Sequence, residues 1–375
     1  QINSILKMKK VIYFVSEDWV FLNHRIELAE KIQKKGYKVI LVTNITHYKK
    51  LIEKKKIKVI PIKIDRGSLN IRKSIKTIYK LNKIFKDVNP DIVHNFGLKQ
   101  IVHGNISAQL AGIKKTFNSI IGLGSAFISN NFFLKFFVTN LLRFTLFFKN
   151  SHILVQNKDD YIFFKKKIWI RKKNLHFNTT SGINLDKYKV SKEPKGKIIF
   201  LFASRILKDK GIIELIKASK KLRKITKNFE LFIAGIIDSQ NPSAVSHEEI
   251  KSWEATDYLK YMGHINDIND LYKKVHVAIL PSYREGLPKG LLEAAACGKP
   301  IITTNVTGCR DVVIDGKNGI LVNPKNSDEL FLAMKKMLQN KKIRLAMGKE
   351  GRIFVKENFL IENTVKKLIH LYKYC

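Results

Sequence analysis

The stretch that decides the fold lies near the start of the chain: VIYFVS at Val11–Ser16, RIELAEKIQKK at Arg25–Lys35 and KVILVT at Lys38–Thr43. The two outer segments are short, apolar and β-branched, which predicts buried strands. The middle segment has apolar residues at helical spacing, and Gly36 follows it as a C-cap. Strand, helix and strand in this order predict a right-handed crossover between parallel neighbours.

The same alternation continues to about residue 190 and restarts after a polar stretch at 191–196. We therefore expect an α/β protein with two Rossmann-like domains, whose parallel sheets face each other across a ligand-binding cleft. The expected domains are residues 8–190 and 191–350, and residues 351–375 are expected to form a helix that packs back on the first domain. The further predicted strands are Lys58–Ile62, Asp91–Phe96, His152–Gln156, Lys197–Ala203, Phe229–Ala234, Val275–Leu280, Pro300–Thr304 and Gly319–Val322.

Composition adds one strong constraint, which is charge. The 375 residues include 70 Lys+Arg and 31 Asp+Glu, giving +39 and indicating an anionic partner. Residues 1–190 carry 37 of the bases and 11 of the acids, and no acid lies between Asp91 and Asp159. The three cysteines show neither a disulfide framework nor metal-ligand spacing. Both halves lack Gly-x-Gly-x-x-Gly after their first strand, which argues against a dehydrogenase.

The strongest chemical signal is PSYREGLPKGLLEA at Pro281–Ala294, which follows a predicted strand and leads into a helix. Gly286 lets backbone approach a ligand, and the helix N-terminus favours an anion. Glu293, a turn into the helix, can accept hydrogen bonds from a ribose diol, and Glu285 can reach sugar hydroxyls. The alternative is an ordinary capping acid and a solvated helical glutamate, which fits each residue alone better than it fits the whole arrangement.

A second signal opens the second half, where SRILKDKG follows the strand Lys197–Ala203. Arg205 and Lys210 lie on this loop, five residues apart, and can direct two cations at one diphosphate. The alternative is a solvated basic loop in a basic protein.

Together these residues resemble retaining GT-B glycosyltransferases of family 4. Glu285 and Glu293, with Gly286 between them, are similar to the family's Glu-x7-Glu motif, and Arg205 with Lys210 resembles its phosphate-binding pair. The likeness spans nearly the whole chain. In the first half it points to the capsule and O-antigen branch, which includes N-acetylgalactosaminyltransferases acting on undecaprenyl-diphosphate-linked saccharides.

The resemblance implies a role for each matched residue. Arg205 and Lys210 would bind the diphosphate, Glu293 the ribose and Glu285 the donor sugar. The segment Gly286, Leu287, Pro288 and Lys289 would lie under the sugar and phosphates, where its three non-proline residues offer backbone N–H groups. His264 would border the base. The implied donor is a UDP-sugar, with an N-acetylhexosamine (GalNAc or GlcNAc) as first choice. Other UDP-hexoses, GDP-mannose and a soluble acceptor remain as alternatives.

The absence of any Asp-x-Asp triplet bears on the mechanism. That triplet would supply the usual carboxylate metal site for a sugar-diphosphate, and Arg and Lys can replace Mg²⁺ in meeting the leaving group's charge. We therefore expect no cofactor and no required metal, and the resemblance implies retention at the anomeric carbon.

Five polar residues of the first half are candidates for the acceptor side of the cleft. Glu17 and Asp18 directly follow the first strand, and Asn23 lies in the same loop, where many family members carry a glycine pair. Asn118 stands where many members have a histidine, so an imidazole role in orienting the sugar is not expected. His94 is a further candidate, although a lone histidine is more often structural than catalytic.

The segment Asn131–Lys149 is rich in phenylalanine and has polar residues on one helical stripe. It is either a buried helix of the first domain or a helix lying on an anionic membrane surface. The second interpretation, combined with the basic first half, predicts a cytoplasmic enzyme of bacterial surface-glycan or glycoprotein-glycan assembly. It would be peripheral on the cytoplasmic face of the inner membrane and would bind a lipid-linked saccharide. A nucleic-acid-binding protein is the rival class, but no recognised nucleic-acid motif accompanies the charge.

Overall fold

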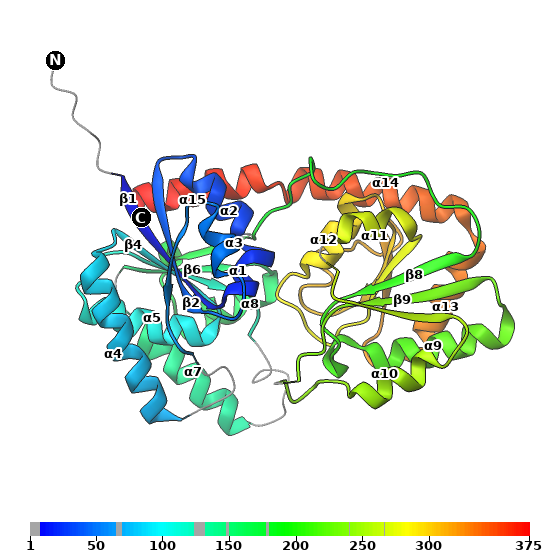
Figure 1. The fold of residues 1–375 in the computed structure, drawn as a ribbon, viewed down its shortest axis with the longest axis horizontal. Coiled ribbons are helices and arrows are strands. Elements are labelled where there is room, and N and C mark those ends of the chain that lie inside the picture. The colour runs from blue at the N-terminus through cyan, green and yellow to red at the C-terminus, as the bar shows by residue number, and fades with distance from the viewer. Residues whose placement is uncertain are drawn as a thin grey trace, which may run out of the picture. The chain divides into compact units, whose positions relative to one another are not determined.

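The computed structural model describes residues 8–64, 70–123, 132–147, 150–177, 180–239, 241–265 and 267–375. The chain divides into two compact units. Unit 1 comprises residues 1–182 and 361–375, and unit 2 comprises residues 183–360. Each unit is a parallel sheet covered by helices, as the alternating pattern predicts (Figure 1).

Unit 1 contains a seven-stranded parallel sheet with strand order β3-β2-β1-β4-β5-β6-β7. Its strands are β1 (Lys9–Glu17), β2 (Tyr37–Asn44), β3 (Lys58–Pro61), β4 (Ile92–Phe96), β5 (Thr116–Ile120), β6 (Ser151–Val155) and β7 (Leu175–Phe177). Its helices are α1 (Asp18–His24), α2 (Ile26–Gln33), α3 (Lys49–Glu53), α4 (Ile71–Val88), α5 (Leu98–Leu110), α7 (Phe132–Leu146), α8 (Lys158–Phe163) and α15 (Ile361–Tyr374). A π-helical turn at Phe164–Ile168 extends α8.

Strand β1 is buried on both faces, as expected for a central strand of a doubly wound sheet. Val11 and Tyr13 contribute to a core that includes residues of α2 and α15, whereas Ile12 and Phe14 contribute to a core with residues of α4 and α5. Figure 1 shows these helix pairs on opposite faces of the sheet. The near-continuous apolar run at Val11–Val15 follows from this double burial.

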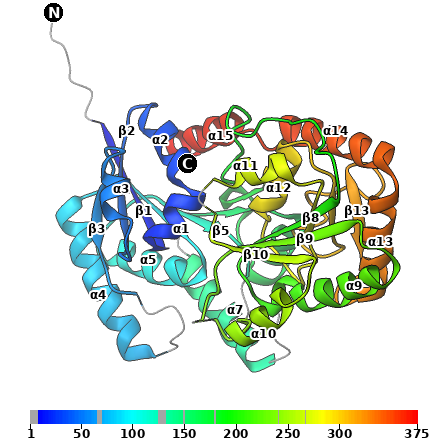
Figure 2. The ribbon, with the colours of Figure 1, turned by 45° about the vertical axis from the view of Figure 1, so that its right-hand side comes forward.

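Unit 2 contains a six-stranded parallel sheet with strand order β10-β9-β8-β11-β12-β13, and Figure 2 shows β10, β9 and β8 side by side. Its strands are β8 (Ile198–Ala203), β9 (Phe229–Ala234), β10 (Leu259–Gly263), β11 (Val277–Leu280), β12 (Ile301–Thr304) and β13 (Gly319–Val322). Its helices are α9 (Ile212–Ile225), α10 (His247–Glu254), α11 (Ile268–Lys274), α12 (Lys289–Ala296), α13 (Ser327–Gln339) and α14 (Lys341–Asn358).

The unit boundaries differ from the expected ones at both ends of unit 2. Residues 183–190 belong to unit 2, because Ile183 and Tyr188 are buried in its core. The expected helix at 351–375 is two helices. Residues 351–358 complete α14 in unit 2, and only α15 belongs to unit 1, where it packs against α2. No helix among the described residues is both long enough and apolar enough to span a bilayer.

Candidate donor-binding site

Two loops of unit 2 leave the sheet side by side. One follows β8 and the other follows β11, and these strands are parallel neighbours, with Phe200 opposite Val277. Gly211 closes the first loop in the left-handed region at φ 72°, and a Cβ there would lie 1.9 Å from the carbonyl oxygen of Pro281. The Tyr283 amide also donates to the Asp209 carbonyl at 2.9 Å. Glycine is therefore required where the two loops touch.

Lys210 and Glu285, one on each loop, form an ion pair. Their side chains are only 15% and 11% exposed, so the pair is largely withdrawn from water. The amide of Glu285 donates to the carbonyl of Thr307 at 3.0 Å, and Gly308 packs against the Glu285 backbone. Two residues that the sequence placed on separate motifs thus belong to one cluster.

Arg205 is oriented by a residue on a third loop. Its Nη1 donates to Oδ2 of Asp238 at 2.8 Å, and Asp238 is buried on the loop after β9. The β8 and β9 loops are in contact, because a Cβ at Gly235 would lie 1.8 Å from the Ser204 carbonyl oxygen. A planar guanidinium held by one carboxylate keeps further N–H donors for a ligand.

Helix α12 begins beside these loops. A Cβ at Gly290 would lie 3.1 Å from the carbonyl oxygen of Ala203, which is the end of β8. Glu293 on the next turn accepts a hydrogen bond from the Tyr188 hydroxyl at 2.6 Å and pairs with Lys289 at 3.2 Å. Gly286 and Pro288 are buried and Leu287 is partly buried, so the loop before α12 is packed against the unit.

Among the residues predicted to bind the donor, His264 lies at the outer side of the six-stranded sheet. It is exposed and directly follows β10, which is the edge strand. The Gly235 amide donates to the Gly263 carbonyl at 2.8 Å, which connects the end of β10 to the β9 loop that carries Asp238. Among the described residues, no hydrogen bond or ion pair joins His264 to Lys210 or Glu285.

Burial keeps the nearby hydroxyl and thiol groups protonated. Burial, followed by the Glu293 charge, raises the pKa of Tyr272 well above its usual range, and the Tyr272 hydroxyl donates to the Gly290 carbonyl at 2.8 Å. Burial likewise raises the pKa of the Cys309 thiol to about 12, with Glu285 adding to the effect. Neither group supplies a nucleophile at neutral pH, and both act as packing around the two glutamates.

In unit 1, the acceptor candidates Glu17 and Asp18 lie at the start of α1, and Asn23 lies near its end. Asp18 is fully buried and accepts hydrogen bonds from the Thr46 amide at 3.0 Å and the Tyr48 amide at 2.9 Å. Glu17 accepts from the indole N–H of Trp19 at 2.7 Å, and Asn23 is exposed. Asp18 therefore ties the loop after β2 to α1, and an acceptor could reach it only by breaking these bonds.

His94 and Asn118 lie inside the unit 1 sheet. The ring nitrogens of His94 bond the Tyr372 hydroxyl at 2.6 Å and the Ser119 hydroxyl at 2.8 Å, and burial lowers its pKa well below the usual range. Asn118 accepts from the Asn95 and Asn105 side chains, and it donates to Ser151 Oγ and the His152 carbonyl. Both side chains thus serve buried polar networks, which sequence alone could not distinguish from cleft positions.

Within the Phe-rich segment, residues 132–147 are described and the ends Asn131, Phe148 and Lys149 lie outside the described residues. Helix α7 turns Leu142 and Leu146 into the core. Its phenylalanines instead face outward, so the buried-helix interpretation is wrong for them. The exposed rings are Phe132, Phe133, Phe136, Phe137, Phe144 and Phe147.

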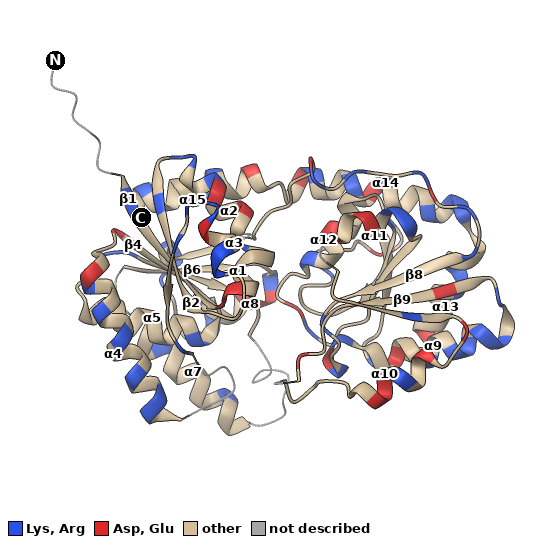
Figure 3. Ribbon diagram, in the orientation of Figure 1, with Lys and Arg blue, Asp and Glu red and all other residues tan. Residues whose placement is uncertain are grey.

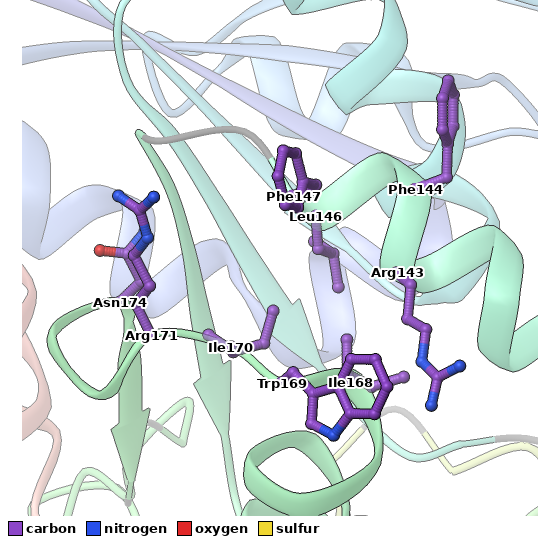
Figure 4. A pocket seen from close by; sticks show the side chains of 9 residues that line it. All are labelled: Arg143, Phe144, Leu146, Phe147, Ile168, Trp169, Ile170, Arg171 and Asn174. Carbon is purple, nitrogen blue, oxygen red and sulfur yellow. The ribbon is translucent and has the colours of Figure 1, made fainter.

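A groove of about 450 Å³ lies at the C-terminal end of this helix. Its apolar walls include Leu146, Phe147 and Ile168, and Figure 4 shows Arg143 and Arg171 on opposite sides of them. The Arg143 guanidinium lies 4.4 Å from the ring of Trp169, which is 73% exposed. Trp169 has φ 58°, an unusual backbone conformation for a bulky side chain.

One cluster of metal-ligand side chains occurs among the described residues, and it is remote in sequence from the donor loops. His152, His176 and Cys375 place ligand atoms within 4.8 Å of one another in unit 1. Burial lowers the pKa of both histidines to about 4, and the positive charges of Lys115 and Lys367 contribute to this. These lysines also oppose the binding of a cation.

Sequence reasoning missed the residues that position the donor site. Asp238 and Tyr188 belong to no recognised motif. Asp238 follows the predicted strand Phe229–Ala234, and Tyr188 precedes the predicted strand Lys197–Ala203. Asp238 could have been suspected, since it follows the strand next to the one that carries Arg205. Nothing local marks Tyr188 as the partner of Glu293.

Two Rossmann-like units, one of them carrying cations and carboxylates at the ends of neighbouring strands, define a GT-B protein. The family described as "Glycosyl transferases group 1" matches residues 185–354, and "Glycosyl transferase 4-like" matches residues 10–157. Together the two matches cover most of the chain, with one on each unit. The chain belongs to the GT-B glycosyltransferases.

Relatives with named activities show which members this chain is similar to. N,N'-diacetylbacillosaminyl-diphospho-undecaprenol α-1,3-N-acetylgalactosaminyltransferase of Campylobacter jejuni is 28% identical over 357 residues, covering 91% of this chain and 92% of the relative. UDP-Gal:α-D-GlcNAc-diphosphoundecaprenol α-1,3-galactosyltransferase of Escherichia coli is 23% identical over 318 residues, covering 81% of each. The structure of Anabaena HepE in complex with UDP and glucose has TM-score 0.80 at 16% identity, covering 98% of this chain and 100% of that one.

Proposed function

We propose that this enzyme transfers an N-acetylhexosamine, GalNAc or GlcNAc, from a UDP-sugar to a polyprenyl-diphosphate-linked saccharide in bacterial glycan assembly. The observation that carries the donor half is the contact between the loops and the helix start that carry Arg205, Lys210, Glu285 and Glu293. Cations and a helix N-terminus bind a diphosphate, and carboxylates beside them accept hydroxyl donors. The two relatives that act on undecaprenol-linked saccharides support the acceptor half.

In the proposed reaction the nucleoside diphosphate leaves with its charge met by Arg205 and Lys210. Asp238 holds Arg205 in place, so the guanidinium needs no reorganisation as charge develops. Glu285 is paired with Lys210, and a donor diphosphate would draw that lysine toward itself and free the carboxylate to bind sugar hydroxyls. The reaction is proposed to retain anomeric configuration and to require no metal.

The acceptor's lipid part has a candidate contact surface in unit 1. The outward phenylalanines of α7 form an apolar surface, and Figure 3 shows Lys and Arg recurring along α4, which packs with α7 against α5. Apolar rings beside cations suit a helix lying in the interface of an anionic bilayer. We propose that the enzyme is a peripheral protein of the inner membrane's cytoplasmic face and binds there through this surface.

The membrane proposal predicts that the protein sediments with anionic liposomes and is released by high salt. Replacing Phe133 and Phe136 together with serine should lower the bound fraction by about tenfold, because two exposed rings lose their apolar contact. Leu332→Ser removes an exposed apolar side chain from unit 2 and serves as control. A protein that stays in the supernatant, or a control that behaves like the double variant, would contradict the proposal.

The donor proposal is tested with a panel of nucleotide-sugars incubated with the protein. We expect slow hydrolysis of a UDP-N-acetylhexosamine and faster turnover once a lipid-diphosphate saccharide is added. Preference for a UDP-hexose or GDP-mannose would change the identity of the proposed donor and leave the enzyme a glycosyltransferase. Failure of every nucleotide-sugar to bind or react would contradict the proposed function.

A further inference from the structure

Arg25 carries a buried positive charge that no acidic side chain in the described part of the chain neutralises. It lies between α1 and α2 and is 6% exposed. No carboxylate among the described residues forms an ion pair with it, and the nearby acids Glu17 and Asp18 serve Trp19, Thr46 and Tyr48. A buried charge is costly unless it is paired, so this position calls for an anion from outside the chain.

The groups that do surround Arg25 are aromatic and neutral. The guanidinium lies 4.8 Å from the ring centre of Phe96, and Phe96 stacks on His94 at 4.1 Å. Burial raises the pKa of Tyr13 to about 12 and lowers that of His94 well below its usual range, so both are uncharged at neutral pH. Burial also lowers the pKa of Arg25 to about 10, which leaves the guanidinium charged.

The helix that follows Phe96 in the chain also favours an anion at its start. Phe96 ends β4, and the next residue, Gly97, is the N-cap of α5 and supplies no side-chain cap. The helix has thirteen residues, and its first turn carries Lys99 and no acid. Arg25 covers the ring of Phe96, and the partial positive charge of this N-terminus lies at the next residue along the chain.

We infer that Arg25, whose guanidinium covers the ring of the residue before the N-cap of α5, is a phosphate-binding site that takes a diphosphate group of one of the two substrates. The identity of the anion rests on the proposed function, in which both donor and acceptor contain a diphosphate. A guanidinium fork over an aromatic ring offers paired N–H donors to phosphate oxygens, and the ring holds its plane in place.

The test measures thermal unfolding with inorganic pyrophosphate, in the full chain carrying Arg205→Ala so that the donor loops contribute little. We expect pyrophosphate to raise the unfolding temperature and Arg25→Met to weaken this apparent binding at least tenfold. Without ligand, Arg25→Met should unfold at the same or a higher temperature, because it removes an unpaired buried charge. Arg72→Met, an exposed arginine of α4, should change neither result.

An unchanged pyrophosphate effect in Arg25→Met would overturn the inference. If that variant also lost stability, Arg25 would be a merely structural arginine. Arg25→Lys keeps the charge but not the fork, and should bind pyrophosphate more weakly while remaining folded. In steady-state assays of Arg25→Lys, a raised KM for the lipid-linked acceptor alone assigns the site to the acceptor diphosphate, and a raised donor KM alone assigns it to the donor. An Arg25-dependent pyrophosphate effect without any sugar transfer would remove the proposed function and leave the site standing.

Discussion

Gly211→Ala should lower kcat/KM for sugar transfer by about 100-fold or more, although residue 211 has no side chain that could touch a substrate. The added methyl would meet the Pro281 carbonyl oxygen at 1.9 Å, so the loops that carry Lys210 and Glu285 would have to separate. Displacing catalytic groups by about 1 Å can cost a factor of this size. The left-handed φ of 72° adds about 1–2 kcal/mol of destabilisation.

Gly316→Ala is the matched control for this variant. Gly316 lies in the same unit with the same φ of 72°, but a Cβ there meets no atom within 4 Å. It should show the backbone penalty in the free energy of unfolding and keep wild-type kcat/KM. Equal activity of the two variants would show that contact between the loops does not hold the site together.

Arg205→Ala should lower kcat by about 100- to 1000-fold, with a smaller change in donor KM. The reason is that the guanidinium is proposed to face charge that develops as the nucleoside diphosphate leaves, and loss of one such donor has a cost of this order. Lys208→Ala, on the same loop but half exposed and 3.7 Å from Glu249, should leave kcat within about twofold. A rise in KM with unchanged kcat would instead make Arg205 a ground-state binding residue.

Asp238→Asn tests whether Arg205 needs a charged partner to hold its guanidinium in place. The amide keeps the size of the carboxylate and loses its charge, so Arg205 would be held less firmly while both loops keep their contacts. The expected kcat lies between those of the wild type and Arg205→Ala.

The fold could be predicted from local patterns, because each strand of a doubly wound sheet is buried on both faces and reads as an apolar run. The strands at Val11–Ser16 and Lys197–Ala203 illustrate this: they correspond to most of β1 and to β8. The strand ranges predicted above do not include β5, β7 or β10, and the unit boundary was missed. The boundary lies before Tyr188, whose ring packs in unit 2 and whose hydroxyl bonds Glu293 more than a hundred residues later.

The candidate site could be predicted only in part. Arg205, Lys210, Glu285 and Glu293 stand on motif-like loops, so sequence could nominate them, but their pairings depend on long-range contacts such as Gly211 with Pro281. His94 and Asn118 show the opposite case. A polar residue at the end of an apolar strand can face a cleft or join an internal network, and only the structure distinguishes these.

The most direct test of the central claim follows the anomeric proton of a UDP-N-acetylhexosamine by NMR during transfer to a lipid-diphosphate saccharide, with EDTA present. We expect undiminished turnover in the presence of EDTA and a product with the donor's anomeric configuration, and turnover lowered by about 100- to 1000-fold in Arg205→Ala. Inverted product, or turnover that stops when EDTA is added, would contradict a retaining transferase in which Arg205 and Lys210 take the place of a metal ion.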